Sequence, residues 1–255
     1  MWPLLLFVGS AGLALFFFFR RRRPVPLGEE GKRTLAQQVG YFARLSAVEQ
    51  TRFREAVERF LADQHISGPR DAPVSEELKV LVAASAVALV FGHKRFVYPR
   101  TRDIVIYDEA FDGEYNTGKH ERFIGMVHGS GPILFSARAL RDAFAKPRDG
   151  IHVGLHEFAH VIDFDGGSAD GVPSLMPWGV ADAWLGMMLR ETKRIRARRS
   201  VLGAYAATND AEFFAVATEA FFEKPRELEA KHPDLYATLA TVYGQHPGRR
   251  DPTAR

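Results

Sequence analysis

Two histidines and a glutamate stand close together in the segment GLHEFAHVID, from Gly154 to Asp163. Residues four apart share one face of an α-helix, so His156 and His160 can present their ring nitrogens to a single cation. Glu157 lies one position further round, where its carboxylate can reach a water held by that cation. Imidazole and carboxylate donors suit Zn²⁺, which in catalytic sites takes three protein ligands and keeps one position for water. The spacing therefore predicts one Zn²⁺ per chain.

The chemistry expected of such a site is hydrolysis. A zinc ion lowers the pKa of its bound water and polarises a carbonyl group, and Glu157 would carry the water's proton to the leaving amine. The competing interpretation is a helix with two ordinary core histidines, because neighbours such as Leu155, Phe158 and Ile162 are apolar. A metal held only for structure would need no base, so the presence of Glu157 favours the catalytic interpretation.

The third protein ligand must come from elsewhere in the chain. A metzincin would carry a glycine and then a histidine where Asp163 and Gly166 stand, so that class is excluded. The remaining pattern takes a glutamate from a second helix, and NDAEFFAVATEAFFE offers Glu212 and Glu219. Glu212 is also explained as the acidic third residue of a helix capped by Asn209, whereas Glu219 stands in mid-helix. These arguments leave the two candidates equal.

A longer set of residues resembles a known family. HEFAH with an aspartate three residues on, GVP, and YAATNDAEFFAVATEAFFEKP are similar to the zinc peptidases of the Mlc titration factor A type, over about Leu35 to Pro247. The resemblance implies a catalytic core like that of anthrax lethal factor, with Glu212 as the third zinc ligand and Glu219 in a supporting or packing role. It also implies that Tyr205 lies near the metal and stabilises the oxyanion. The alternative for Tyr205 is a structural tyrosine at a loop end.

The same resemblance bears on substrate and partner. It implies a zinc-dependent peptidase that acts on peptides in the manner of an aminopeptidase, trimming them from the N-terminus. The family takes its name from binding the repressor Mlc. The alternative function is therefore a regulator that binds and sequesters a transcriptional repressor of that type, with catalysis absent or incidental.

Further residues near the site have predicted roles. Asp163, on the face of the two histidines, is expected either to accept the far N–H of a ligand histidine or to end the helix. In peptidases of this broad kind a sheet edge can hold the substrate as an added strand, and we expect Ile133–Ser136 in that place. His93, His120 and His128 have no ligand spacing and are expected at the surface or in turns.

The rest of the chain must position these residues. Ser46 with Glu49 forms a capping-box pattern, and Ser75 precedes a helix whose uncharged stretch, 80–91, is too short to cross a membrane and is expected in the core. Runs of β-branched and aromatic residues predict strands at 104–107, 123–128 and 133–136. Gly129, Gly131 and Pro132 mark a hairpin between the last two. Helices, a small sheet and more helices predict the α+β class, as a single, mostly helical domain. The HExxH spacing and the resemblance imply that this domain is a zincin-like metallopeptidase.

The N-terminal segment MWPLLLFVGSAGLALFFFFRRRR carries no charge before Arg20. Its apolar part, Met1–Phe19, is about long enough to cross the hydrocarbon layer as one transmembrane helix. A cleaved signal peptide would have basic residues before the apolar run, and here the order is reversed. Because arginines favour the cytoplasmic side, we expect a single-pass protein of the inner (plasma) membrane with a cytoplasmic catalytic domain. The alternatives are a cytoplasmic protein and a hydrophobic tail buried against a partner.

Composition sets limits on function. Of 255 residues, 46% are apolar and 25% charged, as in an ordinary globular protein, and there is no cysteine to form a disulfide or ligate a metal. Arg20–Arg23 account for more than the whole net charge of +3. A second basic cluster, Arg190–Arg199, lacks interleaved aromatic residues, so we expect a solvated helix face and no nucleic-acid partner. The predicted parts are an anchor (1–23), a linker (24–34), the metallopeptidase domain (35–248) and a disordered tail (249–255).

Overall fold

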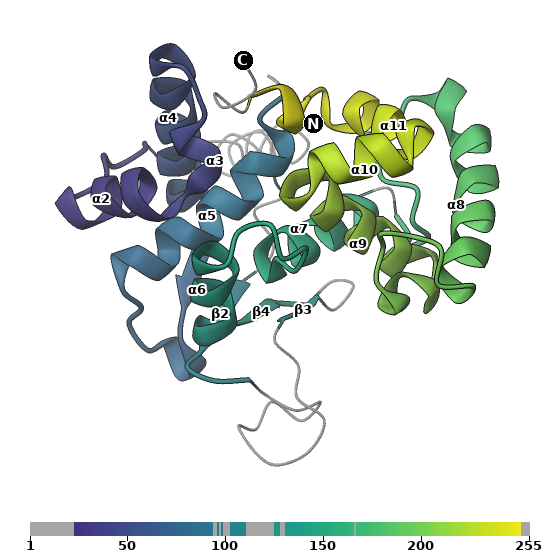
Figure 1. Ribbon diagram of the computed structural model, residues 1–255. Coiled ribbons are helices and arrows are strands. Elements are labelled where there is room, and N and C mark those ends of the chain that lie inside the picture. Colours follow the sequence, from purple (N-terminus) through teal and green to yellow (C-terminus); the bar gives the residue numbers. More distant parts are fainter. Residues whose placement is uncertain are drawn as a thin grey trace, which may run out of the picture.

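The computed structural model describes residues 23–93, 96, 98, 103–110, 125–127, 131–165 and 167–250 (Figure 1). Its α-helices are α2 (Glu29–Gln38), α3 (Gly40–Ala43), α4 (Ala47–Asp63), α5 (Glu76–Val90), α6 (Ala137–Ala145), α7 (Val153–Phe164), α8 (Ala181–Arg196), α9 (Asp210–Glu223), α10 (Pro225–Lys231) and α11 (Pro233–Tyr243). Its strands are β1 (His65–Ser67), β2 (Asp103–Tyr107), β3 (Gly125–Val127) and β4 (Ile133–Ser136). Short 3₁₀ helices are η1 (Pro69–Asp71), η2 (Trp178–Val180), η3 (Ala204–Ala207) and η4 (Pro247–Arg250).

The strands form one mixed sheet in the order β1-β2-β4-β3. β1 pairs with β2 and β2 with β4 in parallel, whereas β3 and β4 are antiparallel, as predicted for a hairpin. The predicted strands 104–107 and 133–136 are confirmed, and the described part of the predicted strand 123–128 is β3. β1 was not predicted, because its three residues, His65–Ser67, include only one apolar side chain. The sheet and its surrounding helices confirm the α+β class.

The prediction that Ile133–Ser136 forms a substrate-binding edge is wrong. This segment is β4, which lies between β2 and β3 and uses both of its sides for pairing. All four of its residues are buried, which explains why the segment is so apolar. The edge strand beside α7 is β3 instead.

Helix α7, which carries the histidine pair, lies at the centre of the molecule. It packs against α5 and α6, against β3 and β4, and against α9 (Figure 1). Its Phe158 is 1% exposed, and the ring centroid lies 5.9 Å from Phe135 of β4, 5.7 Å from Phe60 and 5.4 Å from Tyr98. Burial of one such side chain stabilises the fold by about 1.5–3 kcal/mol, so α7 is firmly held.

Helix α5 packs closely on α7 and confirms the prediction of a buried helix. The Ser75 hydroxyl caps its first turn, and every residue from Val80 to Leu89 is buried. The capping box of Ser46 and Glu49 is likewise present at the start of α4. Where α5 meets α7, a Cβ added at Gly154 would lie 2.7 Å from the Ser85 Cβ and nearer still to its hydroxyl. A glycine is therefore needed for this close approach.

We expect Gly154→Ala to lower the free energy of unfolding by about 1–3 kcal/mol, because the added methyl overpacks the contact between α5 and α7. Gly186→Ala is the matched control, since a Cβ at Gly186 in α8 would meet only the end of the Arg190 side chain, at 3.4 Å. Alanine there should raise stability by up to about 1 kcal/mol through helix propensity. Urea unfolding of both variants measures the difference. A Gly154→Ala protein as stable as the wild type would contradict the close packing.

The segment predicted as a linker, 24–34, is in fact partly helical and packed. Leu27 is buried, and α2 begins at Glu29 and lies against α5. The backbone N–H groups of Leu27 and Gly28 donate hydrogen bonds to the carboxylates of Glu58 and Glu76, at 3.1 Å and 2.8 Å. These contacts join residues about 30 to 50 positions apart, so no local sequence pattern could predict them.

The predicted anchor lies outside the described residues, apart from Arg23, and so do residues 251–255 of the predicted tail. Arg249 and Arg250 belong to η4, so that part of the tail prediction is wrong. Among the helices that the structure describes, none combines the length and the apolar character needed to span a bilayer.

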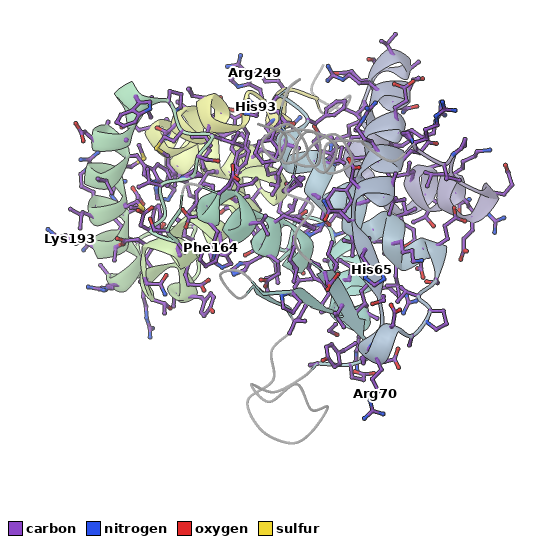
Figure 2. The ribbon with its side chains drawn as sticks, turned by 180° about the vertical axis from the view of Figure 1, so that it is seen from behind. His65, Arg70, His93, Phe164, Lys193 and Arg249 are labelled. Atoms are coloured by element: carbon purple, nitrogen blue, oxygen red, sulfur yellow. The ribbon has the colours of Figure 1, made fainter. Side chains whose placement is uncertain are left out.

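The second basic cluster is a solvated helix face, as predicted. Arg190, Lys193 and Arg196 are exposed on α8, and Figure 2 shows Lys193 pointing away from the molecule. The opposite face of the helix buries Trp184 and Ile195 in the core.

Candidate functional site

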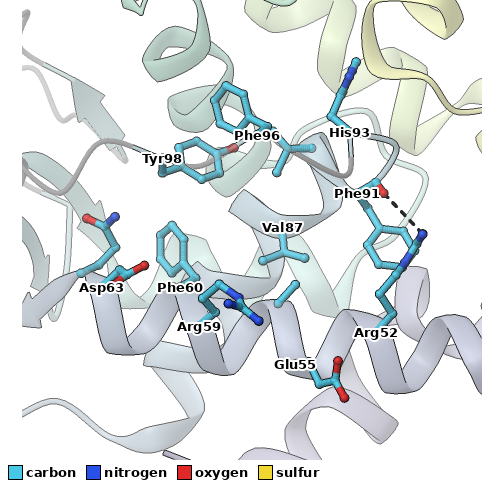
Figure 3. A pocket seen from close by; sticks show the side chains of 13 residues that line it. Arg52, Glu55, Arg59, Phe60, Asp63, Val87, Phe91, His93, Phe96 and Tyr98 are labelled. Carbon is cyan, nitrogen blue, oxygen red and sulfur yellow. Dashed lines mark hydrogen bonds between the residues drawn. The ribbon is translucent and has the colours of Figure 1, made fainter. Parts of the chain in front are cut away.

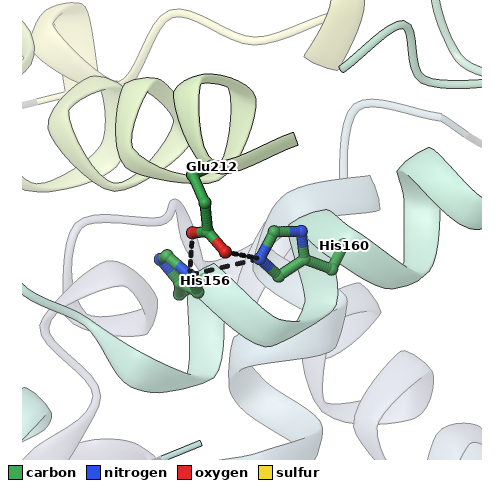
Figure 4. Close-up of side chains that lie close together, drawn as sticks. All are labelled: His156, His160 and Glu212. Atoms are coloured by element: carbon green, nitrogen blue, oxygen red, sulfur yellow. Dashed lines mark hydrogen bonds and ion pairs between the residues drawn. The ribbon is translucent and has the colours of Figure 1, made fainter. Parts of the chain in front are cut away.

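The side chains of His156, His160 and Glu212 converge on one point (Figure 4). The two Nε2 atoms lie 3.2 Å apart, and the Glu212 carboxylate oxygens lie 3.0 Å from His156 Nε2 and 3.5 Å from His160 Nε2. Donors bound tetrahedrally to one zinc ion at about 2.0–2.2 Å are about 3.3–3.6 Å apart. The observed separations agree with this to within a few tenths of an ångström, so the group could hold one metal ion.

An unsatisfied oxygen also fits a cation at this point. Glu212 Oε2 is buried, and within the described part of the chain it has no aligned hydrogen-bond donor, although His156 Nε2 is 3.0 Å away. A buried carboxylate oxygen left in this way costs free energy, and a bound cation would supply the missing partner. Two nitrogens and one carboxylate form a donor set that divalent zinc accepts.

The two candidate glutamates occupy different places. The Asn209 side chain caps α9 by accepting the Glu212 backbone N–H at 2.9 Å, as predicted, while the Glu212 carboxylate turns to the histidines. Two turns later, Glu219 Oε1 lies 2.7 Å from His156 Nδ1, and its Oε2 accepts the backbone N–H of His152. Glu212 thus faces the meeting point, and Glu219 holds the far side of one histidine and the start of α7.

The carboxylates set the charge of the histidine. Burial lowers the pKa of His156, but the nearby carboxylates of Glu212 and Glu219 outweigh it and raise the pKa to about 10. Burial raises the pKa of Glu212, but His156 and His160 outweigh burial and lower this pKa to about 2. A cation that binds the group must therefore displace a proton from His156.

We expect zinc binding to strengthen by about tenfold for each pH unit between about pH 6 and pH 9, because His156 keeps its proton until the pH nears its raised pKa. Calorimetric titrations with Zn²⁺ in buffers of different ionisation enthalpy measure the protons released. In Glu219→Gln the pKa of His156 should fall, and fewer protons should leave near the upper end of this range. Affinity that does not change with pH would contradict the proposed proton displacement.

Glu157 and Tyr205 flank the group. Glu157 is 4% exposed, and burial, opposed by His156, raises the pKa of its carboxyl to about 8. Tyr205 is 57% exposed, with its ring centroid 6.1 Å from that of His156. Burial and then the Glu212 carboxylate raise the pKa of Tyr205, so its phenol keeps a proton to donate. The site thus pairs a buried carboxylate with an accessible hydrogen-bond donor.

Known proteins are similar to this chain over most of its length. Residues 18–244 match the family model described as glucose-regulated metallo-peptidase M90. The chain belongs to this family. A Mlc titration factor A from Pectobacterium atrosepticum is 30% identical over 76% of this chain and 78% of its own length, and one from Escherichia fergusonii is 28% identical over 80% and 82%. An uncharacterized protein of Synechocystis sp. is 28% identical over 87% of this chain and 86% of its own length.

Asp163 of this M90 chain does not support a ligand histidine, and that alternative is wrong. Its side chain is fully buried, and Oδ2 accepts the backbone N–H of Gly171 at 2.9 Å. The Gly171 carbonyl in turn accepts the indole N–H of Trp184 at 2.7 Å. Asp163 therefore ties the end of α7 to the following loop and to α8.

One residue that positions the start of α7 was missed by sequence reasoning. His152 Nδ1 caps α7 by accepting the Leu155 N–H at 3.2 Å, and its ring packs against Phe144 with centroids 4.7 Å apart. Burial lowers the pKa of His152 to about 4, so it remains neutral and able to accept. The signal was a polar residue directly before an apolar helix, but histidine is not among the usual caps.

A cavity of about 760 Å³ lies apart from the metal group, with α4 and α5 in its walls (Figure 3). Arg52 on its rim stacks 4.0 Å above the Phe91 ring and donates to the Phe91 carbonyl at 3.4 Å. His93, also in the lining, follows α5 in a turn as predicted, with Nε2 2.7 Å from the Val242 carbonyl oxygen. None of the residues that line this cavity belongs to the metal group. His120 and His128 lie outside the described residues.

Proposed function

We propose that this M90 chain is a zinc-dependent peptidase, with one Zn²⁺ held by His156, His160 and Glu212. The observation that supports this most is the convergence of their donor atoms, all within 4.8 Å of one another, beside a buried carboxylate on the same helix. Zinc bound there would polarise the carbonyl of the scissile peptide bond. Glu157 takes a proton from the attacking water and delivers it to the leaving amine.

Tyr205 is the proposed donor to the oxyanion. Its exposed phenol borders the metal group through His156, where an incoming peptide can reach it. A hydrogen-bond donor contributes most where negative charge develops in the transition state, which here is the attacked carbonyl oxygen.

The peptide substrate is proposed to extend along β3 as an added strand. β3 pairs with β4 on one side, and no described strand occupies its other side. Because β3 also packs against α7, a peptide there would pass close to the metal group. Aminopeptidase-like trimming is part of the proposal, and it requires a free amino terminus on the substrate.

Peptide cleavage by the purified full chain tests these proposals. Activity should disappear with a chelator and return with added zinc, and acetylation of a substrate's N-terminus should reduce its cleavage. Equal cleavage of free and acetylated peptides would point to an endopeptidase. No cleavage by the zinc-loaded chain of any peptide in a broad set would sink the proposed function.

The second candidate is a regulator that binds a transcriptional repressor. It is favoured by the relatives named Mlc titration factor A, each similar over most of its length. Here binding, and not turnover, would be the function. A repressor of the Mlc type should then bind Glu157→Gln as well as it binds the wild type, and its release from DNA should follow binding alone.

The N-terminal segment is proposed to anchor the catalytic domain at the cytoplasmic face of the inner membrane. The proposed domain covers residues 35–248, and the packing of Leu27 and α2 extends it towards the N-terminus. Membrane fractionation of the full chain, compared with a chain that lacks residues 1–23, tests the anchor. Equal distribution of the two in the soluble fraction would favour the cytoplasmic alternative.

A further inference from the structure

Strand β3 passes unusually close to the side of α7 that carries Glu157. A Cβ placed on Gly125 would lie 2.6 Å from Val153 Cγ2 and 2.8 Å from Glu157 Cδ, and nearer still to a Glu157 carboxylate oxygen. Non-bonded carbon atoms pack at about 3.5–4.0 Å, so no other residue fits here without a shift. Glycine is needed for the closeness of the approach.

We propose that Gly125 is a positioning residue for Glu157, in that the missing side chain provides the space in which the carboxylate lies. The inference rests on the proposed function, in which Glu157 is the base. It adds a residue from the sheet to a set that otherwise comes from α7, η3 and α9.

Glu157 and Phe158 are consecutive in α7 and face the paired strands β3 and β4, which explains why Glu157 and Gly125 lie so close together. Phe158 packs against Phe135 of β4, and both are almost wholly buried. Gly125 is paired with Phe135 across the hairpin, so β3 cannot move freely away from α7. Glu157 is itself 4% exposed and has little space into which to turn. A side chain at position 125 must therefore displace the carboxylate or lift the edge strand.

Either displacement would separate the base from the reacting atoms. A misplacement of about 1 Å can reduce a rate by about 100-fold. We expect Gly125→Ala to lower kcat by about that factor, with KM changed by less than about threefold. Zinc affinity should also stay within about threefold of the wild type, because the atoms nearest to a Cβ at position 125 belong to Glu157 and Val153 and not to the three donor residues. A crystal structure of the zinc-loaded variant should show the Glu157 carboxylate shifted by about 1 Å or more.

Two further variants separate this role from general packing. Gly179→Ala is the control, since a Cβ at Gly179 would have no described atom within 4 Å, and it should behave as the wild type. If Gly125→Ala folds poorly, adding Glu157→Ala should restore folding and zinc binding, whereas adding Val153→Ala should restore much less. Rescue by Val153→Ala alone would overturn the inference, because the space would then serve packing.

A Gly125→Ala enzyme with wild-type kcat and an unmoved carboxylate would overturn the inference as well. If the wild-type chain cleaves no peptide, the proposed function fails on its own. The inference about Gly125 is then still decided by the position of the Glu157 carboxylate and by the folding of the double variants.

Discussion

Replacing Glu157 by glutamine should leave zinc in place and lower kcat by about 10²–10⁴-fold. Glutamine has nearly the same shape and fits the buried position, but its amide cannot accept the proton of the attacking water. The glutamate carboxylate is not one of the three converging donors, so the metal should not depend on it. Metal analysis and the kinetics of peptide cleavage measure the two effects on the same preparation.

Glu191→Gln is the matched control for this substitution. Glu191 is also 4% exposed, but it lies in α8 and pairs with His232, away from the metal group. Its variant should keep wild-type kcat, even if its stability falls. With zinc at saturating concentration, kcat/KM of the wild type should rise with pH as Glu157, whose pKa is raised to about 8, loses its proton, and this rise should vanish in Glu157→Gln. A Glu157→Gln enzyme with more than about a tenth of wild-type activity would show that another group is the base.

Replacing Glu212 by alanine should weaken zinc binding more than replacing Glu219. Glu212→Ala removes one of the three donors, whereas Glu219→Ala removes a group that orients His156 through its far nitrogen. Loss of such an outer partner typically costs about 10–100-fold in affinity, and we expect Glu212→Ala to exceed that range. Competition for Zn²⁺ against a chromophoric chelator measures both constants.

Thermal unfolding gives a second measure of the same difference. A metal that binds only the folded state raises the melting temperature, so added zinc should stabilise the wild type strongly, Glu219→Ala less, and Glu212→Ala least. Glu227→Ala serves as the control, since this exposed residue forms an ion pair with Lys231 and lies on α10. If zinc raised the melting temperature of Glu219→Ala less than that of Glu212→Ala, the proposed roles of the two glutamates would have to be exchanged.

Sequence alone predicted those features that depend on a few consecutive residues. The four-residue spacing of His156 and His160 puts them on one helical face wherever that helix lies. Ser46 and Ser75 cap helices through bonds to backbone groups three residues away. The uncharged stretch in α5 could only be buried, because too little of it is polar to face water. In each case the deciding interactions lie within one element.

Tertiary structure decided whatever depends on the distance between elements. Glu212 and Glu219 lie two turns apart on one face of α9, and only the packing of α9 on α7 selects which carboxylate meets the histidines. The sequence of β4 predicts an apolar strand but not its place in the sheet, and only the strand order shows that it lies between β2 and β3. Gly125 becomes informative only once β3 lies against Glu157. Local periodicity determines which side chains share a face, but the separation of two faces is set by the packing of the whole core, in which every element contributes.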